Sequence, residues 1–280
     1  MTRLCRKTVS LSGRNLSYVE EGEGPVLFLG HGLLWSADVW APLLDRLTPF
    51  FRCIAPDLWG HGLSDSFPLD PETVTVEELT AGMEAFVDAL GVGSFSIVGL
   101  SLGGMWAAQL ASRRPARVVK LVLMNTYTGP ELPDFSEAAL GILRRVEEAR
   151  GFPEEIIEAF LPLYFADSTL ESKPELGDRF RESLRNWPPG ALHSVCAIGR
   201  GAFMRKEGLG QLKGIACPTL VIAGSEDRVR TLEEAQRMMN LLPNAVMRVL
   251  PDAGHVTPLE QPEALAVHLL DFLRYPVETP

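Results

Sequence analysis

The sequence lacks any long apolar run, and this absence bears on where the chain resides. No uninterrupted apolar stretch approaches the roughly 20 residues that a membrane-spanning helix requires. Residues 1–24 carry basic side chains but no apolar segment of the kind found in secretory signals. We therefore expect a cytoplasmic protein that has no membrane partner.

Cysteine and basic side chains are also scarce. Four cysteines occur in 280 residues, and they are too scattered to indicate a metal site or a disulfide framework. Lysine and arginine total 26 against 36 aspartate and glutamate residues, which gives a formal net charge of −10. Binding to nucleic acid needs a basic surface, so no nucleic-acid partner is expected.

What the chain does contain is a regular alternation of short apolar runs and helical patterns. Hydrophobic residues make up 46% of the sequence and charged residues 22%, as expected of a chain with a packed core. Short apolar runs are typical of strands that are buried on both faces of a parallel sheet. The predicted strands lie at residues 26–29, 51–55, 95–98, 117–124, 219–223 and 246–250.

Helical stretches separate these strands, which places the chain in the α/β class. A mostly parallel sheet with helices on both faces follows from this alternation. Binding and catalytic residues of such sheets gather at the carboxyl ends of the strands. Two weakly alternating segments, residues 7–11 and 16–20, predict an additional hairpin before the first buried strand.

Residues 128–213 differ from the rest because they contain no convincing strand. Their apolar residues recur at helical spacing, as at Ile156, Ile157, Phe160, Leu161 and Tyr164. Prolines divide the stretch into short helices. We interpret it as a helical cap that is inserted into one α/β core, and the core comprises residues 1–127 and 214–280.

The most informative stretch is Gly99-Leu100-Ser101-Leu102-Gly103, a G-x-S-x-G sequence between a predicted strand and a predicted helix. This is the context of a nucleophile elbow, in which a strained turn lifts the serine hydroxyl above the sheet. Side chains at Gly99 and Gly103 would clash there, because the strand and the helix nearly touch. The alternative is an ordinary glycine-rich turn, but the flanking strand and helix favour Ser101 as a nucleophile.

A serine nucleophile needs a base that is oriented by an acid. Asp227 and His255 each follow a predicted strand in the last third of the chain. The order Ser101, Asp227, His255 is that of a serine–acid–histidine triad on an α/β sheet. Glu226 and Asp252 are rivals of Asp227 for the role of the acid.

Two backbone amides are expected to bind the oxyanion that forms when a carbonyl is attacked. The Leu102 amide lies at the N-terminus of a predicted helix, where unpaired N–H groups and the helix dipole favour negative charge. The Leu33 amide, in the glycine-containing loop after a central strand, is the second candidate. The candidate pocket residues are Leu34, Trp35 and Leu100.

Together these motifs resemble those of the α/β-hydrolase family with a helical cap. The matching segments span nearly the whole chain outside residues 128–213, and they are Gly30-His31-Gly32, Asp57 with Gly60-His61-Gly62 and Ser64, Gly99 to Gly104, Gly224 with Asp227, and Gly254-His255. The resemblance implies an eight-stranded sheet and neither a metal nor an organic cofactor. Some relatives carry the acid where this chain has Asn125, which leaves Asp227 as the better candidate. We interpret His31 and His61 as structural hydrogen-bonding residues.

Within the family, the elbow and residues 188–190 and 196–198 are similar to those of 3-oxoadipate enol-lactonases, with departures at Trp59, Ala191 and Gly201. The core also resembles small carboxylesterases and cofactor-free haloperoxidases. We expect a serine hydrolase whose partner is a small-molecule ester or lactone of a largely apolar carboxylic acid, cleaved through an acyl-enzyme. Carbon–carbon bond hydrolysis or perhydrolysis by the same triad is one alternative. Ligand binding without catalysis is another.

Overall fold

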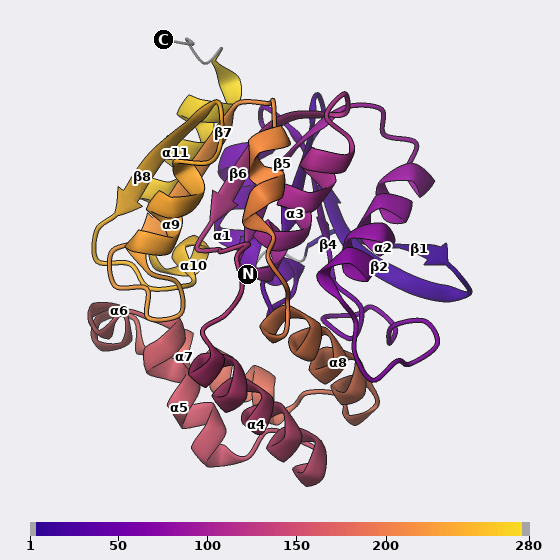
Figure 1. Ribbon diagram of the computed structural model, residues 1–280, viewed down its shortest axis with the longest axis vertical. Coiled ribbons are helices and arrows are strands. Elements are labelled where there is room, and N and C mark those ends of the chain that lie inside the picture. Colours follow the sequence, from indigo (N-terminus) through magenta and orange to yellow (C-terminus); the bar gives the residue numbers. More distant parts are fainter. Residues whose placement is uncertain (1–3, 276–280) are drawn as a thin grey trace.

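A single sheet of eight strands runs through the part of the chain that the computed structural model describes, residues 4–275 (Figure 1). The strands are β1 (Arg6–Leu11), β2 (Arg14–Glu21), β3 (Val26–Gly30), β4 (Arg52–Pro56), β5 (Phe95–Leu100), β6 (Val118–Met124), β7 (Thr219–Gly224) and β8 (Ala245–Leu250). Their order is β1-β2-β4-β3-β5-β6-β7-β8. β2 is antiparallel to β1 and to β4, and all other neighbouring strands are parallel. The predicted mostly parallel sheet and the predicted hairpin are confirmed.

Helices cover both faces of this sheet. They are α1 (Ala41–Leu47), α2 (Val76–Ala89), α3 (Leu102–Arg113), α9 (Leu232–Met239), α10 (Thr257–Glu260) and α11 (Pro262–Arg274). α1 packs against α11, and α2 packs against α3. Among the helices formed by residues 4–275, none is both long enough and apolar enough to cross a bilayer.

The sequence pattern favours a single helix over residues 37–47, but the structure divides this stretch between Trp40 and Ala41, just before Pro42. An α-helix that ran through this stretch would need the residue-42 amide to donate to the Asp38 carbonyl, and proline has no amide proton. Residues Ala37–Trp40 therefore form a 3₁₀ turn that precedes α1. The Ser36 hydroxyl caps this turn by accepting from the Asp38 amide at 3.3 Å.

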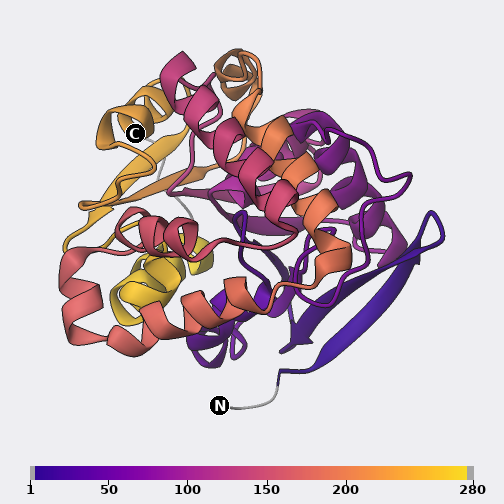
Figure 2. The same ribbon diagram turned by 90° about the horizontal axis from the view of Figure 1, so that it is seen from below.

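Residues 128–213, called the helical segment below, contain helices and no strand. The main helices are α4 (Pro133–Ala149), α5 (Glu154–Tyr164), α6 (Asp167–Ser172), α7 (Pro174–Arg185) and α8 (Leu192–Phe203). Pro133 and Pro174 begin α4 and α7, where the missing amide proton costs no helical hydrogen bond. Figure 1 shows these helices grouped at one end of the sheet, and Figure 2 shows them spread across that end.

Two buried histidines join the loops that follow β3 and β4. His31, in the first loop, donates from Nδ1 to the Gly32 carbonyl at 2.7 Å and accepts at Nε2 from the Leu58 amide of the second loop at 2.9 Å. His61, in the second loop, donates from Nδ1 to a carbonyl of its own loop and accepts at Nε2 from the Leu34 amide of the first loop at 3.3 Å. This network assigns the neutral Nδ1–H tautomer to both rings. The predicted structural roles of both residues are confirmed.

We predict that the protein loses stability as the pH falls from about 7 to about 4. Burial lowers the pKa of His31 to about 4 and the pKa of His61 to about 3, whereas an unfolded histidine has a pKa near 6.5. The unfolded chain therefore binds protons first, and the free energy of unfolding falls by on the order of a few kcal/mol across this range. Urea unfolding of the wild type near neutral pH and at about pH 5 measures the change.

His61→Gln separates the histidine titration from other acid effects. Glutamine keeps an oxygen acceptor for the Leu34 amide but does not titrate, so we expect a flatter dependence of stability on pH. His268→Gln, on α11, is the matched control and should keep the wild-type dependence. Identical pH dependence in all three proteins would contradict the assignment.

Candidate active site

Ser101 occupies a sharp turn between β5 and α3. Its backbone has φ 53° and ψ −117°, a conformation that residues with a side chain rarely adopt. The Ser101 amide donates to the Met124 carbonyl of β6 at 2.9 Å, and Thr126 Oγ1 donates to the Ser101 carbonyl at 2.6 Å. The strained strand–turn–helix geometry that the sequence predicts for this stretch is present.

Glycines make this turn sterically possible. A Cβ atom on Gly99 would lie 2.5 Å from the Gly103 carbonyl oxygen, and a Cβ atom on Gly103 would overlap the Gly30 carbonyl oxygen. A Cβ atom on Gly32 would lie 3.1 Å from Ser101 Cβ, so the loop after β3 passes directly beside the serine. β3, β5 and the start of α3 therefore meet at a point that has no room for side chains.

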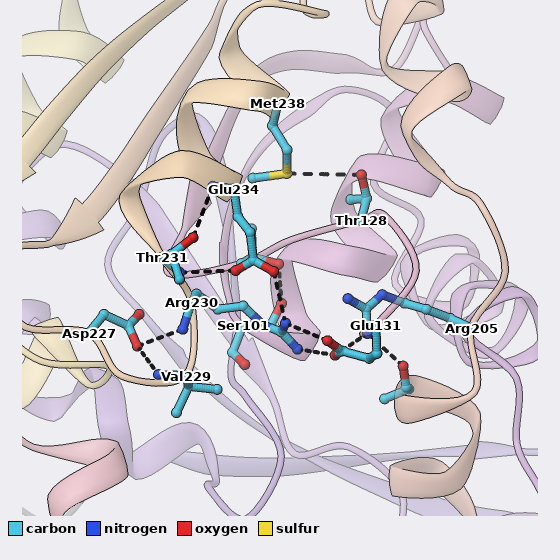
Figure 3. Close-up of polar contacts among 12 residues, drawn as sticks. Ser101, Thr128, Glu131, Arg205, Asp227, Val229, Arg230, Thr231, Glu234 and Met238 are labelled. Carbon is cyan, nitrogen blue, oxygen red and sulfur yellow. Dashed lines mark hydrogen bonds and ion pairs between the residues drawn. The ribbon is translucent and has the colours of Figure 1, made fainter. Parts of the chain in front are cut away.

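A buried carboxylate–imidazole pair lies at the same edge of the sheet. His255 Nδ1 lies 2.9 Å from Asp227 Oδ2 and 3.1 Å from Oδ1. Oδ1 of Asp227 also accepts from the Val229 amide at 2.8 Å and the Arg230 amide at 2.9 Å (Figure 3). Burial opposes the charged carboxylate, but the neighbouring His255 imidazole and the hydrogen bonds that Asp227 accepts lower the pKa of Asp227 overall. Asp227 is therefore charged and holds the shared proton on Nδ1 of His255.

Asn125, which follows β6 at the position where some relatives carry the acid, is a further residue of the site. Its Nδ2 donates to Asp227 Oδ2 at 2.8 Å and to the Gly254 carbonyl at 3.1 Å. Its Oδ1 accepts from Thr257 Oγ1 at 3.1 Å. The Asn125 side chain thus joins the loop of Asp227 to the loop of His255.

Ser101, Asp227 and His255 follow the carboxyl ends of β5, β7 and β8, which lie along one edge of the sheet. Within residues 4–275 the Ser101 hydroxyl makes no hydrogen bond to His255. Contacts between a nucleophile and its base are often long until substrate binds. The two rival acids, Glu226 and Asp252, make no hydrogen bond to His255 in this part of the chain. The structure joins the histidine to Asp227 and leaves the serine hydroxyl unpaired.

Two backbone amides near Ser101 have no acceptor. Neither the Leu33 amide nor the Leu102 amide donates a hydrogen bond within the described residues 4–275. The Gly32 carbonyl, which accepts from His31 Nδ1, belongs to the same peptide group as the Leu33 amide. Because a trans peptide points its N–H away from its carbonyl, His31 fixes the direction of the Leu33 amide.

Aromatic side chains of the helical segment pack over the histidine. The Tyr164 ring meets the His255 ring edge to face at 5.5 Å, and Phe180 stacks on Trp35 at 4.9 Å. Tyr164 and Phe180 also contact each other at 5.2 Å, so these rings form one aromatic wall. The sequence pattern places Tyr164 on the apolar face of a helix but assigns it no role at the site, and it does not single out Phe180. The predicted pocket residues differ in exposure and comprise half-buried Trp35, buried Leu34 and fully buried Leu100.

A buried ion cluster lies between the helical segment and the loop of Asp227 (Figure 3). Glu131 accepts from Arg230 Nη1 at 2.9 Å and from Arg205 Nη1 at 2.5 Å. The three side chains are at most 5% exposed. Glu131 precedes α4 and Arg205 follows α8, so the cluster ties both ends of the helical segment to Arg230. Across residues 4–275, no group of His, Cys, Asp and Glu side chains is arranged to hold a metal ion.

We predict that Ser101→Gly is more stable than Ser101→Ala. Both variants lack the hydroxyl, but glycine adopts φ 53° and ψ −117° without steric strain. Relief of strain is worth about 1–3 kcal/mol, and the greater freedom of glycine in the unfolded chain offsets about 0.4–1 kcal/mol of it. Urea unfolding should therefore favour Ser101→Gly by about 1 kcal/mol.

Ser112, in α3, provides the matched control. At this helical position Ser112→Gly should be less stable than Ser112→Ala by about 1 kcal/mol, the opposite order. If Ser101→Gly were instead less stable than Ser101→Ala, as expected at residue 112, the turn would store no strain.

Comparisons with known proteins agree with this architecture. The sequence model of the alpha/beta hydrolase family matches residues 26–268. The chain is 26% identical to 3-oxoadipate enol-lactonase 1 of Acinetobacter baylyi over 253 residues, which cover 90% of each protein. Among solved structures, it is similar to a thermophilic esterase from Thermogutta terrifontis, with a TM-score of 0.85, 30% identity and 98% of each chain covered. It is also similar to an enol-lactonase from Burkholderia xenovorans LB400, with a TM-score of 0.84, 25% identity, and 96% of this chain and 100% of that one covered. The resemblance noted in the sequence is confirmed, and the chain belongs to the alpha/beta hydrolase family.

Proposed function

We propose that the protein is a serine hydrolase that cleaves an ester or lactone of a small, largely apolar carboxylic acid. The observation that carries this proposal is the buried Asp227–His255 pair at the edge of the sheet where Ser101 occupies its strained turn. Similarity to proteins named as an esterase and as enol-lactonases supports this class of substrate.

In this mechanism the Ser101 hydroxyl attacks the substrate carbonyl. Asp227 keeps the proton of His255 on Nδ1, so Nε2 takes the proton of the serine. The Leu33 and Leu102 amides donate hydrogen bonds to the oxyanion that forms. His255 returns the proton to the leaving oxygen and then activates the water that releases the acyl-enzyme. No metal or organic cofactor takes part.

In this proposal the helical segment acts as a cap over the core formed by residues 1–127 and 214–280. Its aromatic wall lies against the His255 ring. Apolar walls with a few polar groups are typical of small-molecule sites, because they bind apolar surface and limit the access of water. The wall therefore favours an acyl group with apolar surface.

We predict that Ser101→Ala abolishes hydrolysis and leaves the fold intact. Loss of the nucleophile should lower kcat by about 10⁴-fold or more. Turnover of p-nitrophenyl esters of increasing acyl length, followed by a panel of lactones, measures the loss and the size of the pocket. Labelling by a fluorophosphonate reports an active serine independently of the substrate.

Ser112→Ala is the control for this experiment and should retain activity and labelling. A soluble Ser101→Ala variant with full activity would refute the proposal. A wild-type protein that is labelled but hydrolyses neither esters nor lactones would favour carbon–carbon hydrolysis or perhydrolysis by the same residues. Absence of both labelling and turnover would favour ligand binding without catalysis.

We predict that Asp227→Asn lowers kcat on the order of 10⁴-fold. Oδ1 accepts from two backbone amides, whereas Oδ2 accepts from one side-chain amide, that of Asn125. The new NH2 group would therefore take the place of Oδ2, where it opposes fewer donors, and donate to His255 Nδ1. The proton of the imidazole would then move to Nε2, which could no longer act as a base. Steady-state kinetics test this, with the exposed Asp252→Asn as the control. Equal activity of the two variants would exclude Asp227 as the acid.

A further inference from the structure

Glu260, at the end of α10, is a buried carboxylate that the proposed mechanism does not use. The residue is 1% exposed. Its Oε2 accepts from the Gly254 amide at 3.0 Å, and its Oε1 accepts from the Val256 amide at 3.0 Å. These two amides flank His255, so Glu260 holds the backbone on both sides of the histidine.

The same carboxylate also binds the helical segment. Oε2 accepts from the Ala166 amide at 2.8 Å and from Thr169 Oγ1 at 2.9 Å. The His255 amide itself donates to the Tyr164 carbonyl at 3.0 Å. Residues 254–256 are called the histidine loop below. Their three consecutive amides are thus held either by Glu260 or directly by the helical segment.

The contacts of Glu260 match a carboxylate in particular. Both of its oxygens face only hydrogen-bond donors, and an ionised carboxylate is a pure acceptor. Burial raises the pKa of Glu260, and the four hydrogen bonds oppose that rise. A glutamine at this position would carry an NH2 group in place of one oxygen. In one orientation that group would face the Val256 amide, and in the other it would face the three donors around Oε2, so it would oppose a donor in both.

We propose that Glu260 is a positioning residue. It couples the packing of the α5–α6 region against the core to the position of His255. Asp227 orients the imidazole ring, whereas Glu260 fixes the backbone that carries it. Displacement of Tyr164, Ala166 and Thr169 would at once remove the acceptor of the His255 amide and two donors to Glu260. This proposal rests on the proposed function, because it takes His255 to be the base.

The test compares Glu260→Gln with the wild type. Misplacement of a catalytic group by about 1 Å costs about 10²-fold in rate, so we expect kcat to fall by about 10²-fold with KM nearly unchanged. Proton NMR of the His255 Nδ1–H bonded to Asp227 should show a shifted or broadened signal. Loss of stability alone would change neither kcat of the folded protein nor this signal.

Thr169→Val provides a milder variant in case Glu260→Gln does not fold. It removes one donor to Glu260 from the helical segment and keeps the shape of the side chain. Its matched control is Thr80→Val, at a buried threonine of α2 whose hydroxyl bonds to the Val76 carbonyl and to Gln109. We expect kcat to fall for Thr169→Val, by a smaller factor than for Glu260→Gln, and to stay unchanged for Thr80→Val.

The outcomes separate this proposal from the proposed function. A folded Glu260→Gln protein with wild-type kcat and an unshifted His255 signal would overturn the positioning role, as would equal kcat for Thr169→Val and Thr80→Val. Retention of activity by Ser101→Ala would overturn the proposed function instead. The NMR signal reports the placement of His255 in either case, because it does not depend on turnover.

Discussion

The close approach of three backbone segments at Ser101 is the constraint on which the rest of the site depends. Gly30, Gly99 and Gly103 leave no space for a Cβ atom where β3, β5 and α3 meet. This contact holds the serine in an unfavourable backbone conformation and brings the loop of Leu33 beside it. Hydrogen bonds to the Met124 carbonyl and from Thr126 keep the turn in place, so the sheet itself offsets the local strain.

Buried polar side chains hold the surrounding loops, and each of them bonds to more than one loop. His31 and His61 join the loops after β3 and β4, and Asn125 joins those of Asp227 and His255. Such groups stay favourable only while all of their partners are present, because a buried polar atom without a partner is costly. The loops after β3 and β4 therefore form one hydrogen-bonded unit, and the loops of Asn125, Asp227 and His255 form another. The loops within each unit cannot move apart without breaking hydrogen bonds.

The sequence predicts the sheet, the strained turn and the pairing of Asp227 with His255, because each follows from local patterns and from strand order. The division of the first helix at Pro42 is also a local effect, since proline removes one helical donor. The hydrogen bonds of Asn125 and Glu260 could not be predicted in this way. Asn125 bonds to Asp227 across 102 residues, and Glu260 bonds to Ala166 across 94 residues. Such contacts depend on how distant loops and helices fold against each other, which no spacing in the sequence expresses.

The ion cluster of Glu131, Arg205 and Arg230 has a consequence for how such proteins diversify. It brings Glu131, which precedes α4, and Arg205, which follows α8, to one place on the core, at the Arg230 side chain in the loop after β7. A module whose ends meet can be exchanged by recombination without changing the spacing of the strands that flank it. The contacts of Tyr164 and Ala166 set the condition for such an exchange. A transplanted segment must bring its own carbonyl for the His255 amide and its own amide for the Glu260 carboxylate, and this limits which segments one core can accept.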